Sequence, residues 1–333
     1  MIDLTVIWAG IIGFAIVAYV VMDGFDLGIG ILFPRFAVGA ERDVAINSVA
    51  PVWDGNETWL VLGGGGLMAA FPLAYAIVLP ALYAPLIAML LGLILRGVAF
   101  EFRWRDPAHR PVWDLAFTVG STVATFAQGV TLGALLQGIT VEGRAYAGGW
   151  WEWLSPFSVL TGIGLIVGYA LLGAGWLIWK TEGPLQDKAY RYAQRLGIAL
   201  LVVIALVSLA TLDLEAQYHR RWLAYPGVLA TAQVPLATLI VSVLFFRSLK
   251  RRQHAMPFVY VLGLFSLCIV GLGVSIWPDV IPARLTIWDG AAPYRSQLFM
   301  LVGAVVMVPI ILAYTGWAYW VFRGKVDTEG YHS

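Results

Sequence analysis

The sequence has little charge. Only 12% of its 333 residues are Asp, Glu, Lys or Arg, whereas a soluble globular domain carries about 25%. Hydrophobic residues make up 60% of the chain, and the mean hydropathy is +0.80. These values exclude a soluble globular protein and predict one that crosses a membrane several times. The net charge of +1 lacks the positive excess of a nucleic-acid-binding protein, so no nucleic acid is expected as a partner.

Residues that hold cofactors and metals are also scarce. The single cysteine, Cys268, excludes a disulfide framework and a cysteine metal site within this chain. The four histidines, His109, His219, His254 and His332, fall in loops or at the edges of apolar segments. A membrane haem held by histidine needs that residue inside the helix bundle. The chain has no Walker A, zinc-binding or nucleophile-elbow motif either. We therefore expect no catalytic residue and no metal ligand in this chain.

Long apolar segments, by contrast, fill the sequence. A membrane-spanning helix needs about 20 mostly apolar residues. Nine segments qualify: 5–33, 48–71, 75–99, 112–137, 155–179, 192–212, 226–247, 257–277 and 294–322. The first segment lacks the basic start and the cleavage site of a signal peptide, so it is expected to be a span. Because the connections are short, residues 1–333 are expected to form a single membrane domain with no soluble domain.

The distribution of basic residues predicts the orientation. With the N-terminus outside, most of the 21 Lys and Arg residues fall in cytoplasmic segments. This bias is what the positive-inside rule requires. We therefore predict an all-α polytopic membrane protein of nine transmembrane helices, with the N-terminus outside and the C-terminus cytoplasmic.

Four acidic residues, Asp23, Asp26, Asp54 and Glu57, lie in or against the first two spans. A carboxylate inside a bilayer costs about 2.5–3.5 kcal/mol on insertion scales, so such groups usually serve a function. Within each pair the two residues are three apart in sequence and share one helix face. The default interpretation is a path for protons or cations. The alternative is that each acid only links helices through an ion pair or a hydrogen bond.

The predicted topology brings Arg96 and Glu101, at the end of the third span, to the same membrane level as the four acids. Five carboxylates and one guanidinium, from three adjacent helices, would then lie together in the cytoplasmic leaflet. Such a cluster is able to pass protons drawn from the cytoplasm.

The second span also carries small and aromatic residues of interest. Four consecutive glycines are Gly63, Gly64, Gly65 and Gly66. Glycine lets helices pack closely, which is the commoner explanation, and it also permits a helix to unwind where its backbone lines a cavity. Trp53 and Trp59 could flank a flat ligand such as a quinone ring, although packing is the more frequent use of such residues.

Several segments resemble one family. These are MDGFDLGIGIL (22–32), NSVAPVWDGNETWLVLGGGGLMAAFP (47–72), LRGVAFEFR (95–103), LTIWDGAAPYRSQL (285–298) and VPIILAYTGWAYW (308–320). Together they resemble subunit II of the cytochrome bd-type quinol oxidases, and they occur in the order expected for that family. The middle of the chain, roughly 138–255, is similar mainly in hydropathy and length.

The resemblance implies a fold, partners and an activity. It implies two four-helix bundles, approximately 1–137 and 150–322, plus one peripheral helix. It implies a heterodimer, in a bacterial inner membrane, with a haem-bearing subunit I that ligates haems of b and d type. Such a complex oxidises quinol on the outer side and reduces oxygen to water with protons from the cytoplasm. A bound quinone in this chain and a small accessory subunit stay open, and membrane lipid is an expected partner.

The resemblance also implies roles for single residues. The acid of the Trp-Asp-Gly-Asn motif falls on Asp54, a member of the family's proposed proton path, with Asp23 and Asp26 leading to it. Arg96 is implied to tune local charge or to lie near haem propionates. Glu101 replaces an Asp of some relatives and keeps its charge on a longer arm. Glu57 replaces a Gln of some relatives, which adds an ionisable group to the path.

Two other functions compete with the oxidase hypothesis. A proton-coupled secondary transporter would use the membrane carboxylates and the glycine run as a midplane site. However, the acids all lie toward one leaflet, and no paired broken helix recurs in a second half. The third hypothesis is a purely structural assembly subunit.

Overall fold

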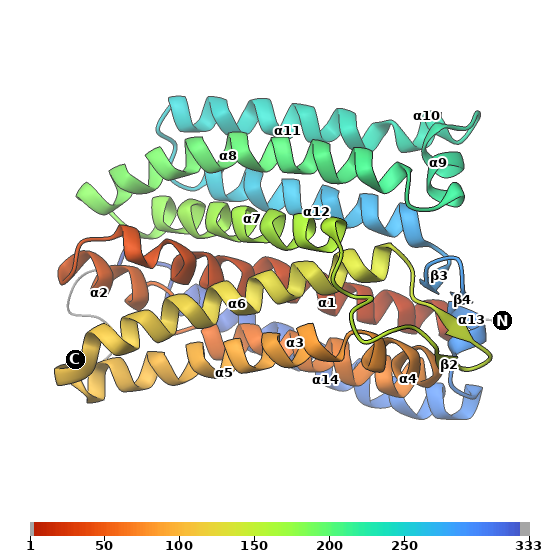
Figure 1. Ribbon diagram of the computed structural model, residues 1–333. Coiled ribbons are helices and arrows are strands. Elements are labelled where there is room, and N and C mark those ends of the chain that lie inside the picture. Colours follow the sequence, from red (N-terminus) through yellow and green to blue (C-terminus); the bar gives the residue numbers. More distant parts are fainter. Residues whose placement is uncertain (1–2, 327–333) are drawn as a thin grey trace.

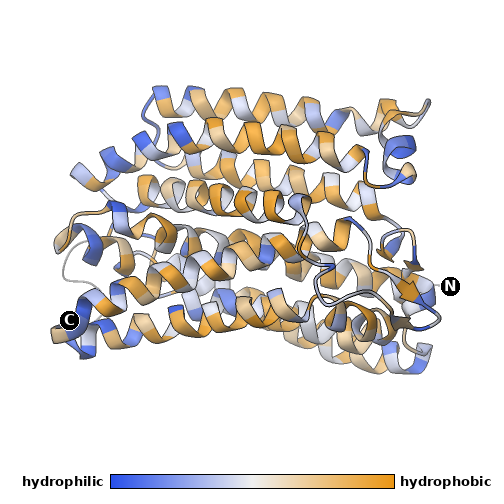
Figure 2. Cartoon of the chain, in the orientation of Figure 1, coloured by the Kyte–Doolittle hydropathy of each residue, from blue (hydrophilic) through white to orange (hydrophobic). Residues whose placement is uncertain are grey.

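The computed structural model describes residues 3–326, and most of these lie in helices that run along one common direction (Figure 1). Within this part of the chain, eight helices are long and apolar enough to cross a membrane, and one pair joined by a bend of 120° passes the same test together. Hydrophobic residues fill the middle of the helices, and hydrophilic residues gather toward both ends (Figure 2). This pattern confirms the predicted class, an all-α polytopic membrane protein.

The elements follow one another with short connections. The long helices are α1 (Leu4–Leu32), α3 (Trp53–Ala70), α5 (Tyr83–Arg105), α6 (Arg110–Leu136), α7 (Pro156–Lys180), α8 (Gly183–Leu212), α11 (Gln233–Lys250), α12 (Met256–Ile276) and α14 (Tyr294–Val321). The short ones are α2 (Ala40–Asn47), α4 (Pro72–Ala81), α9 (Ala216–Leu223), α10 (Val228–Thr231), α13 (Ile287–Gly290) and the 3-10 turns η1 (Phe33–Arg35) and η2 (Pro107–His109). Two antiparallel strand pairs join β1 (Val141–Glu142) to β2 (Ala145–Tyr146) and β3 (Asp279–Ile281) to β4 (Leu285–Thr286).

A break at Leu82, between α4 and α5, corrects the predicted bounds of the third span. Hydropathy places this span at 75–99, whereas residues 72–81 form the separate helix α4 and the span itself is α5, which begins at Tyr83. The bend between α3 and α4 falls in the gap between the predicted second and third spans, and Pro72 explains it, because a proline disfavours the helical conformation of the residue before it. Phe71 accordingly has φ −130° and ψ 60°. Sequence hydropathy averages over the break at Leu82 and therefore did not detect it.

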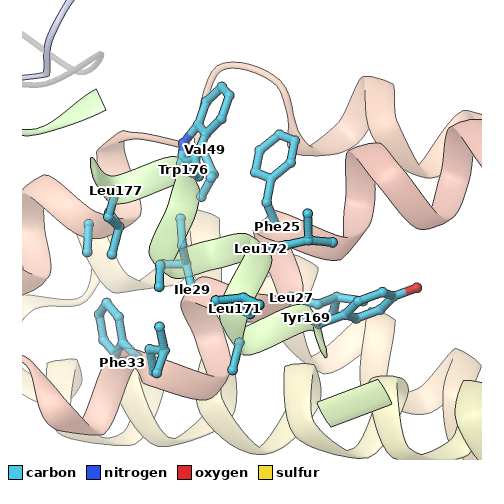
Figure 3. Close-up of a cluster of buried hydrophobic side chains, with 14 of the residues drawn as sticks. Phe25, Leu27, Ile29, Phe33, Val49, Tyr169, Leu171, Leu172, Trp176 and Leu177 are labelled. Atoms are coloured by element: carbon cyan, nitrogen blue, oxygen red, sulfur yellow. The ribbon is translucent and has the colours of Figure 1, made fainter. Parts of the chain in front are cut away.

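The most tightly packed part of the core lies where α1 crosses α7 (Figure 3). Gly28 of α1 and Gly173 of α7 bring the two backbones into contact, since a Cβ atom on Gly28 would lie 1.8 Å from the carbonyl oxygen of Tyr169. Beside this contact Phe25 stacks on Trp176, with 4.2 Å between the ring centroids. In a membrane, lipid tails are as apolar as the side chains, so close packing of this kind holds the helices together.

A network of ion pairs joins α2 to the ends of α5 and α6. Arg103 is only 2% exposed, and it contacts Asp114 at 2.6 Å and Asp43 at 2.8 Å. Arg42 contacts the other oxygen of Asp114 at 2.7 Å. In the sequence, the connection after the first span shows no apolar segment of its own. In the structure it contains the short helix α2, whose residues Arg42 and Asp43 form these ion pairs. These ion pairs position the ends of the helices that carry the residues described next.

The start of α1 and the end of α14 lie at opposite ends of the bundle (Figure 1). The indole of Trp8 donates to the backbone carbonyl of Gln297, close to the start of α14, at 3.1 Å. The ammonium group of Lys180, at the end of α7, donates to the carbonyl of Phe322, which follows α14. An odd number of membrane crossings gives this arrangement. The membrane side that each end faces stays a prediction.

Candidate functional site

A buried cluster of charges lies between α1, α3 and α5. The Arg96 guanidinium, from α5, has no exposed surface, and its Nη1 atom lies 2.8 Å from Oδ1 of Asp23 on α1. Its Nη2 atom pairs with Glu57 on α3. The side chain of Asp23 is fully buried, whereas 26% of the Glu57 side chain is exposed. One cation therefore joins two carboxylates from two other helices inside the apolar region, where an unpaired charge would be costly.

Asp26 lies one helical turn beyond Asp23 and is held by a different residue. The Asn56 amide, on α3, donates to Oδ2 of Asp26 at 2.7 Å and to the carbonyl of Met22 at 3.2 Å. The amide oxygen of Asn56 accepts a bond of 2.9 Å from the hydroxyl of Tyr319 on α14. Asn56 therefore connects α1, α3 and α14. The other oxygen of Asp26, Oδ1, accepts no hydrogen bond from any described residue, so a proton arriving there would meet a free acceptor.

A chain of polar groups continues on the other side of Asp23. The Gln128 amide of α6 donates to the hydroxyl of Tyr19 at 2.7 Å, and it accepts from the hydroxyl of Tyr169 at 3.0 Å. Both tyrosines are buried. Tyr19 precedes Asp23 by one helical turn on α1, so this hydrogen-bonded group adjoins the charge cluster. The sequence analysis missed these partners, although a lone glutamine in an apolar helix is a usable signal.

The structure separates two predicted members from the cluster. Asp54 is exposed on α3 and makes no ion pair or hydrogen bond with any residue described here. Glu101 is 52% exposed on α5 and faces Arg105 of its own helix at 3.5 Å. The prediction placed five carboxylates and Arg96 in one leaflet. Of the five, Asp23 and Glu57 contact the guanidinium, and Asp26 lies next to them.

The four consecutive glycines of α3 lie on two different faces of the helix. Gly63 and Gly66 are buried and face α1, since Cβ atoms there would lie 3.7 and 3.0 Å from Cγ1 of Ile16 and Ile12. Gly64 and Gly65 are exposed and face away from α1. The helix stays wound through all four glycines, so the arrangement is close packing and not an unwound segment.

The two tryptophans of this helix have different surroundings. Trp53 stacks on Phe100 with 4.9 Å between centroids, and the Arg96 guanidinium lies 5.9 Å from its ring. Trp59 is buried at 1% exposure, and the edge of its ring meets Phe14. Both rings therefore contact side chains of this chain, as packing requires. The aromatic and cation–π contacts of Trp53 additionally fix the position of Arg96.

Replacing Asn56 with leucine is expected to destabilise the subunit by about 1–3 kcal/mol, because Asp26 loses its donor while it stays buried. Tyr319→Phe serves as the matched control. It removes only the phenol donor and leaves the bond to Asp26, so its effect should be the smaller one, about 1 kcal/mol. Thermal melting of the purified assembly measures both. Equal melting temperatures for the two variants would contradict the bridging role of Asn56.

The described residues contain no group of three or more His, Cys, Asp or Glu side chains able to hold a metal ion. His109, His219 and His254 are exposed, and none lies within the membrane-spanning part of a long helix. His332 lies outside the described residues. The chemistry that this arrangement offers is thus the binding and transfer of protons among carboxylates, hydroxyls and amides.

The fold and the buried charges define a polytopic helical membrane protein with an internal cluster suited to proton transfer. Residues 4–322 match the family described as cytochrome bd terminal oxidase subunit II. The chain therefore belongs to this family, and the resemblance found in its motifs is confirmed.

Individual relatives agree with this assignment along almost the whole chain. It is 31% identical to cytochrome bd-I ubiquinol oxidase subunit 2 of Escherichia coli K12, over 97% of this chain and 95% of that protein. It is 28% identical to cytochrome bd ubiquinol oxidase subunit 2 of Bacillus subtilis, over 96% of each. Its fold is similar to a chain of the bd oxidase from Geobacillus thermodenitrificans, with a TM-score of 0.78, 17% identity, and coverage of 96% of this chain and 99% of that one.

These findings decide between the oxidase and the transporter hypotheses. The chain is a multi-pass protein of a bacterial inner membrane and a subunit of a cytochrome bd-type terminal oxidase, which implies a subunit I partner and haems carried by the complex. The hypothesis of a proton-coupled secondary transporter finds no support in them.

Proposed function

We propose that this chain is the non-haem-ligating subunit of a quinol:oxygen oxidoreductase, and that it delivers cytoplasmic protons toward the site of oxygen reduction in subunit I. Haems of b and d type would be ligated by the partner, because the described histidines of this chain lie outside its bundle. In the complex the haems supply the electron transfer and the oxygen chemistry. This chain supplies a scaffold that excludes water and groups that bind protons.

The observation that carries the proton role is the buried Asp23–Arg96–Glu57 cluster. Three ionisable groups from three helices meet inside the membrane region, and one of the carboxylates, Glu57, reaches partway to the surface. Asp54 lies one helical turn from Glu57 and is exposed on the subunit. We propose that Asp54 is the relay at the surface and that Glu57, Asp23 and Asp26 form its connection inside the chain.

Arg96 tunes this connection in our proposal. Its guanidinium compensates the negative charge of the two carboxylates that contact it, Asp23 and Glu57, and holds both at the same place in the membrane region. Arg96 is fully buried and contacts Asp23 and Glu57, which supports charge tuning as its role; proximity to a haem propionate of the partner stays a prediction. Glu101, on the exposed side of α5, is left as a candidate for the entry of protons from the cytoplasm.

Purifying the chain and recording its visible spectrum tests whether it assembles with a haem-bearing subunit. The chain is tagged after its last residue, extracted from native membranes in mild detergent, and its reduced-minus-oxidised visible spectrum is recorded. We expect haem bands and a second large subunit on the gel. A colourless preparation that contains this chain alone would contradict the proposed assembly.

A further inference from the structure

A pocket of about 480 Å³ opens between α8 and α11 at the basic end of the bundle, away from the charge cluster. Four of its lining residues come from one face of α8, at the spacing i, i+3, i+4 and i+7 from Asp187 to Gln194. The opposite wall comes from the last turns of α11, from Phe246 to Lys250, and from Arg252 just beyond them. The family's oxidase activity assigns nothing to this place.

The rim of the pocket is held in place by its own contacts. Arg252 contacts Asp187 at 2.5 Å, and its guanidinium lies 5.1 Å from the centre of the Tyr190 ring. The hydroxyl of Tyr190 donates to the carbonyl of Gln253 at 3.1 Å. These bonds tie the connection after α11 to the start of α8. They also neutralise Asp187, which is the only acidic residue among those that line the pocket within the described chain.

Two positive charges in this pocket have no counterion. Arg191 and Lys250 line it from opposite helices, and both are exposed. Neither forms an ion pair or a side-chain hydrogen bond with any residue between 3 and 326. Since Arg252 is already paired with Asp187, the pocket presents a net excess of two positive charges. Its complement is therefore a ligand group that carries negative charge.

Exposed apolar residues follow the pocket along both helices. Ile198 and Val202 follow Gln194 along α8 and are 55% and 54% exposed. Val243 and Leu239 precede Phe246 along α11 and are 59% and 62% exposed. Figure 2 shows hydrophilic residues at the ends of these two helices and hydrophobic ones along their length. A ligand seated here would place a charged group at the rim and apolar chains against the helices.

We propose that this pocket binds the headgroup of an anionic phospholipid. Basic pockets between transmembrane helices bind lipid phosphates, with each Lys or Arg worth about fivefold in binding. Arg191 and Lys250 would contact the phosphodiester, and the acyl chains would lie against the exposed apolar residues of α8 and α11. A soluble anion would contact the charges but not the apolar residues, and a zwitterionic lipid would contact the apolar residues but gain nothing from the charge excess.

Lipid titration followed by native mass spectrometry tests this site on the purified oxidase complex. Phosphatidylglycerol and phosphatidylcholine with the same acyl chains are added in turn to the wild type and to the double variant Arg191→Gln, Lys250→Gln. The matched control is Arg195→Gln, Arg247→Gln. These two residues lie on the same two helices and are exposed, and they do not line the pocket. Both double variants lose the same charge, and the mass spectrum itself reports whether the complex is intact.

We expect phosphatidylglycerol to bind the wild type more tightly than phosphatidylcholine does. The pocket variant should bind it about 30-fold more weakly, as two removed basic residues predict, and the control should bind it as the wild type does. Equal losses in both variants would overturn the proposal, because binding would then follow the overall charge of this end. Displacement of the lipid by millimolar inorganic phosphate would also overturn it, since the site would then recognise a free anion. The outcome does not depend on the proton role of Asp54.

Discussion

Replacing Arg96 with glutamine is expected to prevent stable accumulation of the oxidase complex. The substitution leaves Asp23 without a cation at a position with no exposed surface, and it leaves Glu57 without its only ion-pair partner in the described chain. Breaking a buried ion pair by removing one partner costs about 3–5 kcal/mol, because the remaining charge is left uncompensated. A loss of this size is comparable to the whole stability of many domains. The amount of complex extracted in mild detergent, and its melting temperature, measure the effect.

Two comparisons separate this effect from a general loss of charge. Arg105→Gln removes an arginine from the same helix at a position that is 76% exposed, so its cost should stay within about 1 kcal/mol. The triple variant Asp23→Asn, Glu57→Gln, Arg96→Gln removes the whole cluster and should recover a large part of the lost stability. If Arg96→Gln accumulated and melted like the wild type, the cluster would not be a paired and buried one.

The second large effect is expected at the crossing of α1 and α7. In Gly28→Ala the new methyl group would lie 1.8 Å from a backbone oxygen and 2.6 Å from a backbone carbon of Tyr169. Backbone atoms cannot move aside as the end of a side chain can, so the two helices must separate. Overpacking usually costs about 1–3 kcal/mol, and this substitution should reach or exceed the upper end. A large fall in the melting temperature of the complex would report it.

Gly13→Ala provides the matched control for this substitution. Gly13 lies in the same helix, and a Cβ atom there would meet nothing within 4 Å. Alanine favours a helix over glycine by up to about 1 kcal/mol, so this variant should be neutral or slightly stabilising. Similar melting temperatures for the two variants would show that α1 and α7 do not contact each other through Gly28.

The long helices were largely predictable, because a helix that crosses a membrane must consist mostly of apolar residues. The apolar segments 5–33 and 155–179 correspond to α1 and α7 within a few residues. Hydropathy failed at Leu82, where a local change of backbone conformation divides one apolar stretch into α4 and α5. It also missed α2, whose polar residues Arg42 and Asp43 form ion pairs with Asp114 and Arg103. The division into two four-helix bundles stays a prediction.

The candidate site was predictable in its residues but not in its contacts. Asp23 and Asp26 share a face of α1 and are both buried, because α1 is surrounded by other helices. Asp54 and Glu57 have the same spacing, yet they separate into one exposed and one partly buried residue. Residues three apart differ by about 60° around a helix, so at the edge of a contact one of them turns inward and the other outward. Sequence spacing alone does not place that edge.

The contacts of Asn56 were not predictable from the sequence either, because its partners lie far away along the chain. Its place between Asp54 and Glu57 is visible in the sequence, but its role depends on Met22 and Tyr319, which come from the two ends of the chain. Only the folded arrangement brings these groups together. A polar residue inside an apolar helix was therefore a sign of a buried contact, although not of its partners.

Proton uptake during oxygen reduction tests the central claim most directly. The purified complex is reconstituted in liposomes with quinol, and oxygen consumption and proton uptake are recorded together for the wild type and for Asp54→Asn. The haem spectrum serves as the control for assembly, since Asp54 makes no contact within the described chain that its loss would break. If Asp54 relays protons, the variant should keep its haem bands and lose both rates together by at least about 100-fold, the contribution typical of a positioned acid–base group. Unaltered oxygen consumption and proton uptake in a fully assembled variant would contradict the account and leave this chain a structural subunit.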